Sequence, residues 1–173
     1  EHNALLPLIS SDPMLAARLL LALMIEPPQP EDDWTDRELW DDLAVTKALR
    51  VEPSPYWLPL YSLLRRHPRC GVEVVLKLTQ HATDRWYEWR WETGRSEGNP
   101  KTRVGSITLQ VDGEAIEFRG GRHLIYWHRA NPWAPSLVVT ALMCLELFLY
   151  DLIDELGTED EGLLGLVTSI LLR

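Results

Sequence analysis

Cysteine is scarce in this chain of 173 residues, which contains only Cys70 and Cys144. The two positions lie far apart in the sequence, and neither belongs to a C-x-x-C pair. The pattern offers neither a disulfide framework nor a zinc signature. We therefore expect two buried free thiols in a reducing cytoplasm, and we expect this chain to bind no metal and no cofactor.

Two other kinds of motif are absent from the sequence. Neither of the glycine-rich phosphate-binding patterns, G-x-x-x-x-G-K-[ST] and G-x-G-x-x-G, occurs. The stretch Arg119-Gly120-Gly121-Arg122 could offer backbone amides to an anion, but the exit of a hairpin explains its glycines better. The N-terminus has no basic segment followed by an apolar run, so the sequence predicts no signal peptide.

Positive charge is in short supply, since the formal net charge is −9. It is also unevenly spread: residues 65–129 hold 12 Lys/Arg against 8 Asp/Glu, while the rest of the chain is strongly acidic. DNA-binding domains normally concentrate basic residues in one patch, because they displace counterions from phosphates. Nucleic-acid binding through the basic middle segment is therefore only a second alternative function. The acidic run Glu31-Asp32-Asp33 is expected to be a solvated loop.

Helical patterns dominate the first half of the chain. Asp12-Pro13 resembles a helix start, because a short polar residue caps the first turn and proline is tolerated at its first position. Leu15, Leu19, Ala22 and Leu23 then recur at helical spacing. A capping box at Thr35–Glu38 predicts a second helix. In all, we expect helices near 13–26, 35–49, 54–67 and 71–89.

The stretch RWYEWRWE, residues 85–92, contains three of the eight tryptophans of the chain. Val75, Leu78, Ala82, Trp86 and Trp89 would form one apolar stripe on a helix, and we favour this interpretation. The alternative is a strand over 86–92, in which Tyr87, Trp89 and Trp91 would share one face. In both cases the rings are expected mainly to pack into the core or its edge. The remaining interpretation is a contact surface for another protein or domain, because Trp and Arg are common interface anchors.

A β-hairpin is the clearest local pattern after the polar stretch 91–101. SITLQVDGEAIEF alternates around Asp112-Gly113, and both residues tolerate the positive φ of a type I′ turn. We expect strands near 104–111 and 114–119, as an insertion of about 103–120. A hairpin is marginal alone, so it must dock on the helices or on a further strand.

The C-terminal part should again be helical. Residues 123–133 are ambiguous, whereas Pro135-Ser136 opens a long apolar helix that ends at Gly157, and a capping box at 158–161 starts a last helix. Residues 134–150 are too short and too acidic for a typical membrane span, which needs about 20 apolar residues. A core helix is the better interpretation.

Few residues suggest chemistry. His67 and Cys70 could form a nucleophile pair, and His81 and Asp84 lie three residues apart on one helix face, but no third ligand or oxyanion loop is apparent. His123 and His128 flank Tyr126-Trp127 at a spacing that suits neither one helix face nor one strand face. An enzyme or small-molecule-binding protein that uses His81, Asp84, His123 or His128 is therefore an alternative function.

Part of the chain resembles a known group of proteins. Two segments of the chain are similar to the helical region downstream of the ATPase core in large bacterial STAND-type ATPases, some of them used in antiphage defence. The segments are HLIYWHRANPWAPSLVVTALMCLELFLYDLIDELG (123–157) and HATDRWYEW (81–89). The shared features are a Trp-rich helix end, a hairpin, a Trp-Ala-Pro-Ser stretch and a long apolar helix. The resemblance implies a scaffold or sensor module, with ATPase chemistry elsewhere in the polypeptide.

The sequence as a whole predicts a mainly α fold of antiparallel helical pairs, a HEAT-like solenoid or a bundle, with one inserted hairpin. A small α+β fold with a three-stranded antiparallel sheet is the alternative. We expect residues 1–173 to form a single domain, a fragment of a longer bacterial cytoplasmic chain, and to act as a non-catalytic scaffold, interaction or sensor module. The predicted partner-binding residues are Trp86, Trp89, Trp91, Arg122, His123, Trp127, His128 and Arg129.

Overall fold

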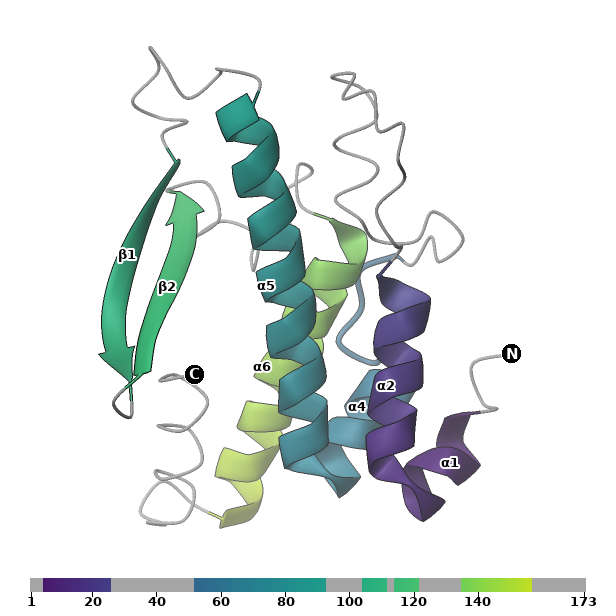
Figure 1. The fold of residues 1–173 in the computed structure, drawn as a ribbon. Helices are drawn as coiled ribbons and strands as arrows, with labels where there is room; N and C mark the ends of the chain where they lie inside the picture. Colours follow the sequence, from purple (N-terminus) through teal and green to yellow (C-terminus); the bar gives the residue numbers. More distant parts are fainter. Residues whose placement is uncertain (1–4, 26–51, 93–103, 112–113, 122–134, 157–173) are drawn as a thin grey trace.

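The structure is a computed structural model that describes residues 5–25, 52–92, 104–111, 114–121 and 135–156. These residues form helices and one two-stranded antiparallel sheet (Figure 1). The helices are α1 (Leu5–Ser11), α2 (Pro13–Met24), α4 (Leu58–Arg66), α5 (Pro68–Glu92) and α6 (Ser136–Leu156), and the strands are β1 (Val104–Val111) and β2 (Glu114–Gly121). The mainly helical fold with an inserted hairpin is confirmed. The helices predicted at 35–49 and after 158 lie outside the described residues.

Helix α5 is the centre of the described fold. It contacts α2, α4, α6 and both strands, and α6 runs antiparallel beside it (Figure 1). Val75, Leu78, Ala82 and Trp86 recur at helical spacing along α5, and all four are buried. Removing such a stripe from water is the main favourable term in folding, at about 25 cal/mol per Å² of apolar surface. The predicted apolar stripe is therefore confirmed as far as Trp86.

The same helix decides between the two interpretations of RWYEWRWE. Helix α5 continues through Glu92, three residues beyond the predicted end, so the strand predicted as an alternative over 86–92 is wrong. The three-stranded sheet that depended on this strand is wrong for the same reason, and the described sheet has two strands. Residues 86–92 continue the helix and do not form a strand, because the apolar stripe starts upstream and neither glycine nor proline interrupts it between Gly71 and Glu92.

Helix α2 begins as the sequence predicts. The side chain of Asp12 accepts a hydrogen bond from the backbone amide of Leu15 at 2.9 Å, and Pro13 occupies the first turn. Its buried face consists of Ala16, Ala17, Leu20 and Met24. The leucines whose spacing predicted the helix, Leu15, Leu19 and Leu23, lie instead on its exposed side. Because α2 is apolar nearly all round, its period identifies a helix without identifying the buried face.

Helix α4 starts later than Ser54-Pro55. The hydroxyl oxygen of Ser54 accepts a hydrogen bond from the amide of Tyr56 at 3.2 Å, which closes a turn before the helix begins at Leu58. The backbone of Ser54 is held by α6: its amide donates to the hydroxyl oxygen of the buried Thr140 at 3.4 Å, and its carbonyl accepts from the thiol of Cys144 at 3.7 Å. These contacts satisfy polar groups that burial would otherwise leave unpaired.

The two strands of the hairpin pair in the register that the sequence predicts. Val111 pairs with Glu114, Leu109 with Ile116 and Ile107 with Phe118. Paired residues of antiparallel strands point to the same side of the sheet. The alternation in the sequence therefore separates two faces, one apolar with Ile107, Leu109 and Ile116, and one largely polar with Ser106, Thr108, Gln110, Glu117 and Arg119.

Gly71 allows α4 and α5 to approach closely. A Cβ atom at this position would lie 2.7 Å from Cα of Leu64 and 2.8 Å from its Cγ. Both Gly71 and Leu64 are buried, and the first of these contacts is to backbone, so a methyl group forces the two helices apart. Elsewhere in a helix the change from glycine to alanine stabilises by up to about 1 kcal/mol.

We expect Gly71→Ala to lower the free energy of unfolding by about 1–3 kcal/mol, as overpacking of a core does. Urea denaturation of the full chain measures the change. Gln80→Ala, at an exposed position of the same helix, is the matched control and should change stability by less than about 0.5 kcal/mol. An equal or higher stability for Gly71→Ala would contradict the close contact between α4 and α5.

Candidate interaction surface

The structure divides the predicted partner-binding residues. Trp86 is fully buried in the core, so its ring is not part of the exposed surface of the described residues, and its role in partner binding stays a prediction. The continuous apolar stripe of α5 carries it inward. Trp89 and Trp91 lie on the last two turns of α5. Their side chains, and all of Arg122, His123, Trp127, His128 and Arg129, lie outside the described residues. Their roles in partner binding therefore stay predictions.

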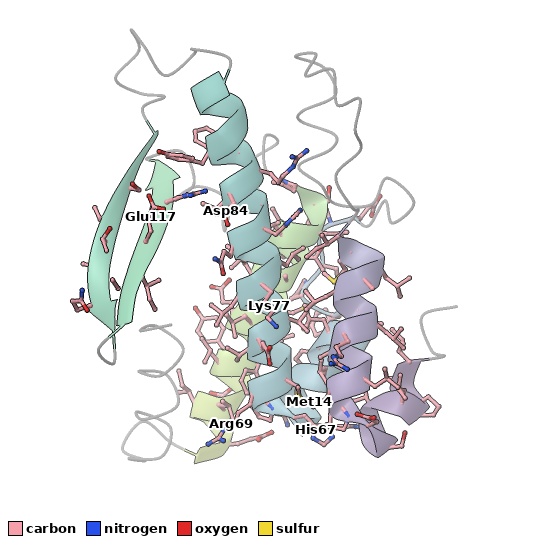
Figure 2. The ribbon with its side chains drawn as sticks, in the orientation of Figure 1. Met14, His67, Arg69, Lys77, Asp84 and Glu117 are labelled. Atoms are coloured by element: carbon pink, nitrogen blue, oxygen red, sulfur yellow. The ribbon has the colours of Figure 1, made fainter. Side chains whose placement is uncertain are left out.

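Arg119 on β2 connects the hairpin to α5. Its guanidinium lies 3.7 Å from the carboxylate of Asp84, and its Cζ lies 5.2 Å from the centre of the Tyr87 ring. Its Nε also donates to the carboxylate of Glu117 on the same strand at 3.2 Å. Figure 2 shows Asp84 on the side of α5 that faces β2, with Glu117 across from it. One cation thus joins an acid and an aromatic ring of the helix to the sheet.

The charges around this contact support one another. The pKa of Glu117 is lowered by a hydrogen bond from Ser106 and by Arg119, and the pKa of Arg119 is raised, first by its hydrogen bond with Glu117. Ser106, Glu117 and Arg119 all belong to the polar face of the hairpin. The polar face therefore carries the contacts to α5, because Arg119 makes them.

The apolar face points the other way. The exposed fractions are 61% for Ile107, 47% for Leu109 and 37% for Ile116. Sheets that cover a core normally place their apolar face against it and their polar face toward water. In this hairpin the polar face makes the contact to α5 through Arg119, although Ser106, Thr108 and Glu117 on that face are themselves exposed. The other face presents β-branched and leucine side chains at the surface. We call Ile107, Leu109 and Ile116 the outer hairpin face.

A second exposed apolar surface lies on α2. Met14, Leu15 and Leu19 are exposed on its side away from the core. In Figure 1 the hairpin and α2 stand on opposite sides of α5. Single exposed apolar residues are ordinary, but groups of them commonly mark sites of protein contact. The described residues thus offer two such surfaces, one on either side of the central helix.

Several basic residues of the middle segment are engaged by acids. The guanidinium of Arg65 on α4 donates to Glu155 on α6, Lys77 lies 2.6 Å from Glu73, and Arg119 pairs with Glu117 and Asp84. Beside the first of these pairs, the hydroxyl of Tyr61 donates to Asp151, which raises the pKa of Tyr61 together with its burial. Each of these cations lies beside an acid, which reduces the surplus positive charge that phosphate binding requires.

Two of the candidate chemical groups, Asp84 and Cys70, contact other side chains in the structure. Asp84 faces Arg119 rather than a vacant site. His67 is the residue after the last turn of α4, while the thiol of Cys70 lies 3.5 Å from the thioether sulfur of Met14 on α2. In the described ranges, no three His, Cys, Asp or Glu residues gather as ligands of a metal ion would. Sequence reasoning missed Arg119, whose only signal is its place on the polar face of the predicted hairpin.

Cys144 lies deep in the core on α6. Its burial raises the pKa of the thiol to about 11, despite an opposing hydrogen bond with the backbone of Trp57. Only the thiolate reacts with disulfide reagents. Cys70 is partly exposed. The predicted buried free thiol is therefore confirmed for Cys144, whereas Cys70 lies at the edge of the core.

Helix α6 is also the longest apolar segment of the described chain. Residues Ser136–Glu155 have the length and composition of a membrane span, and among the described residues no other helix does. The core helix of a soluble protein passes the same test. One side of α6 packs into the core through Leu137, Val138, Ala141, Cys144 and Phe148. Its last turns carry the acids that contact Tyr61 and Arg65.

Comparison with known proteins gives no relative for this chain. No protein family, no curated protein and no solved structure matches it. The resemblance of residues 81–89 and 123–157 to STAND-type ATPases therefore stays a prediction.

We expect the two thiols to differ strongly in reactivity. At pH 8 an aromatic disulfide reagent should modify Cys70 in the folded chain within minutes, and it should reach Cys144 only when denaturant is added, since burial and the raised pKa suppress its thiolate. Cys70→Ser should remove the fast phase and leave the slow one. Rapid modification of both thiols in the native protein would contradict the burial of Cys144.

We expect Arg119→Met to release the hairpin from α5 while the helices persist. Amide hydrogen exchange in 104–121 should become at least tenfold faster, because a two-stranded sheet is marginal without a support. Amides of α5 near Leu78 should keep their protection. Arg69→Met, at an exposed arginine of the same helix, is the matched control. Unchanged exchange in the hairpin would show that Arg119 does not hold it.

The same contact should weaken in acid. A lowered pKa in the folded chain means that Glu117 contributes stability above the pKa of an unfolded glutamate, about 4.3. This contribution is lost as the pH falls through the lower folded value. Hairpin amide shifts, followed by NMR, should therefore hold from pH 7 to about pH 5 and change below about pH 4.

Proposed function

We propose that the chain is a non-catalytic protein-interaction module, a scaffold or sensor part of a larger bacterial cytoplasmic protein. The observation that carries the proposal is the hairpin, which is joined to α5 through Arg119 while Ile107, Leu109 and Ile116 remain exposed. Keeping apolar side chains in water is unfavourable by about 25 cal/mol per Å². A surface of this kind is typical of a site that another protein covers.

The proposed contact region extends from the hairpin to the Trp-rich end of α5. The end of β2 lies at the same end of the described fold as the last turn of α5 (Figure 1). Residues 122–129 follow β2 directly in the sequence, and Trp89 and Trp91 belong to the last turns of α5. In this proposal the interface anchors are Trp89, Trp91, Trp127 and the basic and histidine side chains beside Trp127. Trp86 supports them from the core.

The wider setting belongs to the same proposal. Helical pairs such as α4 with α5 and α5 with α6 are compatible with one part of a HEAT-like solenoid, in which each unit contacts its neighbours. The exposed side of α2, opposite the hairpin, would then face an adjacent unit of the same polypeptide. A STAND-type ATPase is the parent protein that the resemblance implies.

The proposal is tested by partner recovery with matched variants. The tagged full chain is isolated from cells that produce it, and bound proteins are quantified by mass spectrometry. Trp91→Ala combined with Trp127→Ala should reduce recovery of specific partners at least tenfold, and it should shift the melting temperature by no more than a few degrees. Trp86→Ala should instead destabilise the core by about 3–5 kcal/mol. If the double variant keeps its partners, or only unfolds, the proposed interface is wrong.

A further inference from the structure

Two tyrosine rings stand at an angle to each other where α4 begins. Tyr56 lies in the turn before the helix, and Tyr61 lies in its first turn. Their ring centres are 6.4 Å apart, and their planes make an angle of 70°. Tyr56 is 69% exposed, whereas Tyr61 is half-buried. Two rings in this arrangement can both lie within about 6 Å of one cation, which is the range of cation–π attraction.

A carboxylate lies beside the same pair. The hydroxyl of Tyr61 donates a hydrogen bond to Asp151 on α6. A phenol that donates to a carboxylate gains negative charge in its ring, which strengthens the attraction of the ring for a cation. The carboxylate adds its own negative charge at the edge of the pair. The pKa of Tyr61 is raised, first by this hydrogen bond, so its ring stays a neutral phenol at pH 7.

The charge of the two elements around the tyrosines is negative. Helix α6 contains no basic residue and four acids: Glu146, Asp151, Asp154 and Glu155. Residues 52–66 add one acid and two arginines, so the two elements together hold five acids against two arginines, which is a net charge of −3. One of these arginines, Arg65, donates to Glu155. The surroundings of Tyr61 therefore attract cations, although the middle of the chain is basic.

The backbone of Tyr56 is held in place even though its ring is exposed. Its amide donates to the hydroxyl oxygen of Ser54 at 3.2 Å. The backbone of Ser54 is bound in turn to Thr140 and Cys144 of α6, and the next residue after Tyr56, Trp57, is buried. A ring on a fixed backbone loses little freedom when it binds, so this part of the surface is preorganised for a ligand.

We propose that Tyr56, Tyr61 and Asp151 form a binding site for a quaternary ammonium group. Such a cation has no N–H to donate, and its methyl groups pack on the faces of aromatic rings. A primary ammonium is strongly hydrated and gains less from the same rings. Choline-type molecules and trimethyllysine side chains both carry the group. The inference goes beyond the proposed function, because the site uses α4 and α6 and not the outer hairpin face.

The test compares a cation with a neutral molecule of the same shape. Choline chloride is titrated into the isotopically labelled full chain and followed by NMR, with sodium chloride at the same concentration in the reference sample. We expect the ring signals of Tyr56 and Tyr61 to shift with a dissociation constant on the order of a few millimolar. The neutral analogue 3,3-dimethylbutanol should bind at least fivefold more weakly. Equal binding of the two compounds, or no saturable shift of these rings, would overturn the proposal.

Two substitutions at one exposed position test the role of the ring. Tyr56→Leu removes the ring and should weaken choline binding at least fivefold, whereas Tyr56→Phe keeps the ring and should weaken it by less than threefold. Both variants should melt within a few degrees of the parent chain. Tyr87→Leu, at a ring that already lies against Arg119, is the control outside the site and should not change binding. Equal losses for Tyr56→Leu and Tyr56→Phe would contradict a contact with the ring face.

The carboxylate has a separate test. Asp151→Asn keeps an acceptor for the hydroxyl of Tyr61 and removes the charge, so it should weaken choline binding at least threefold without changing the binding of 3,3-dimethylbutanol. An equal effect on both compounds would show that Asp151 acts only through the fold, and would remove it from the site.

The source of the group is distinguished with two further probes. A short peptide with one trimethyllysine is compared with choline and with the same peptide carrying unmodified lysine. Tighter binding of the trimethyllysine peptide than of choline would assign the group to a protein side chain, and the reverse would assign it to a small molecule. Tighter binding of the unmodified peptide would overturn the proposal. None of these results bears on the proposed function, whose own test depends on Trp91 and Trp127.

Discussion

Burial of the apolar stripe of α5 is the interaction on which the described structure depends. Val75, Leu78, Ala82 and Trp86 place one side of this helix against α2, α4 and α6, and every one of those helices contacts it. Once that side is buried, the orientation of the remaining side is determined. Asp84 and Tyr87 then lie toward the hairpin, where they meet Arg119. The outward direction of Ile107 and Leu109 is therefore a consequence of which residues of α5 are apolar.

The hairpin differs from a core strand pair in what holds it. Its contacts with the helical body include a guanidinium, a carboxylate and an aromatic ring, and its apolar side chains Ile107, Leu109 and Ile116 remain at the surface. A polar connection of this type has a defined geometry and contributes little net stability where water can reach it. It positions a surface more than it strengthens the fold, which is the property that a binding platform requires.

The elements of this fold were largely predictable from the sequence, and their contacts were not. Three sequence patterns predict local structures that the chain adopts: the start of a helix at Asp12-Pro13, a hairpin from the alternation around residues 112–113, and a buried helix face from Val75 to Trp86. Which side of α2 is buried could not be predicted, because leucine and alanine occupy almost every position. The direction of the hairpin depends on a contact between Arg119 and Asp84, 35 positions apart. The predicted site shared this limit: periodicity placed Trp86 on the buried stripe of α5, but it could not identify which side chains contact a partner.

The contacts that α4 and the turn before it make with α6 have a consequence for the synthesis of the protein. Three hydrogen bonds join residues that are 86 to 90 positions apart: Ser54 with Thr140, Tyr61 with Asp151 and Arg65 with Glu155. A ribosome has therefore translated most of α6 before α4 and α5 can gain their contacts with this helix. Nascent chains with such late-closing contacts fold slowly and expose aggregation-prone surface. Production of this protein should accordingly benefit from slow translation or from a chaperone that shields α5 on the ribosome.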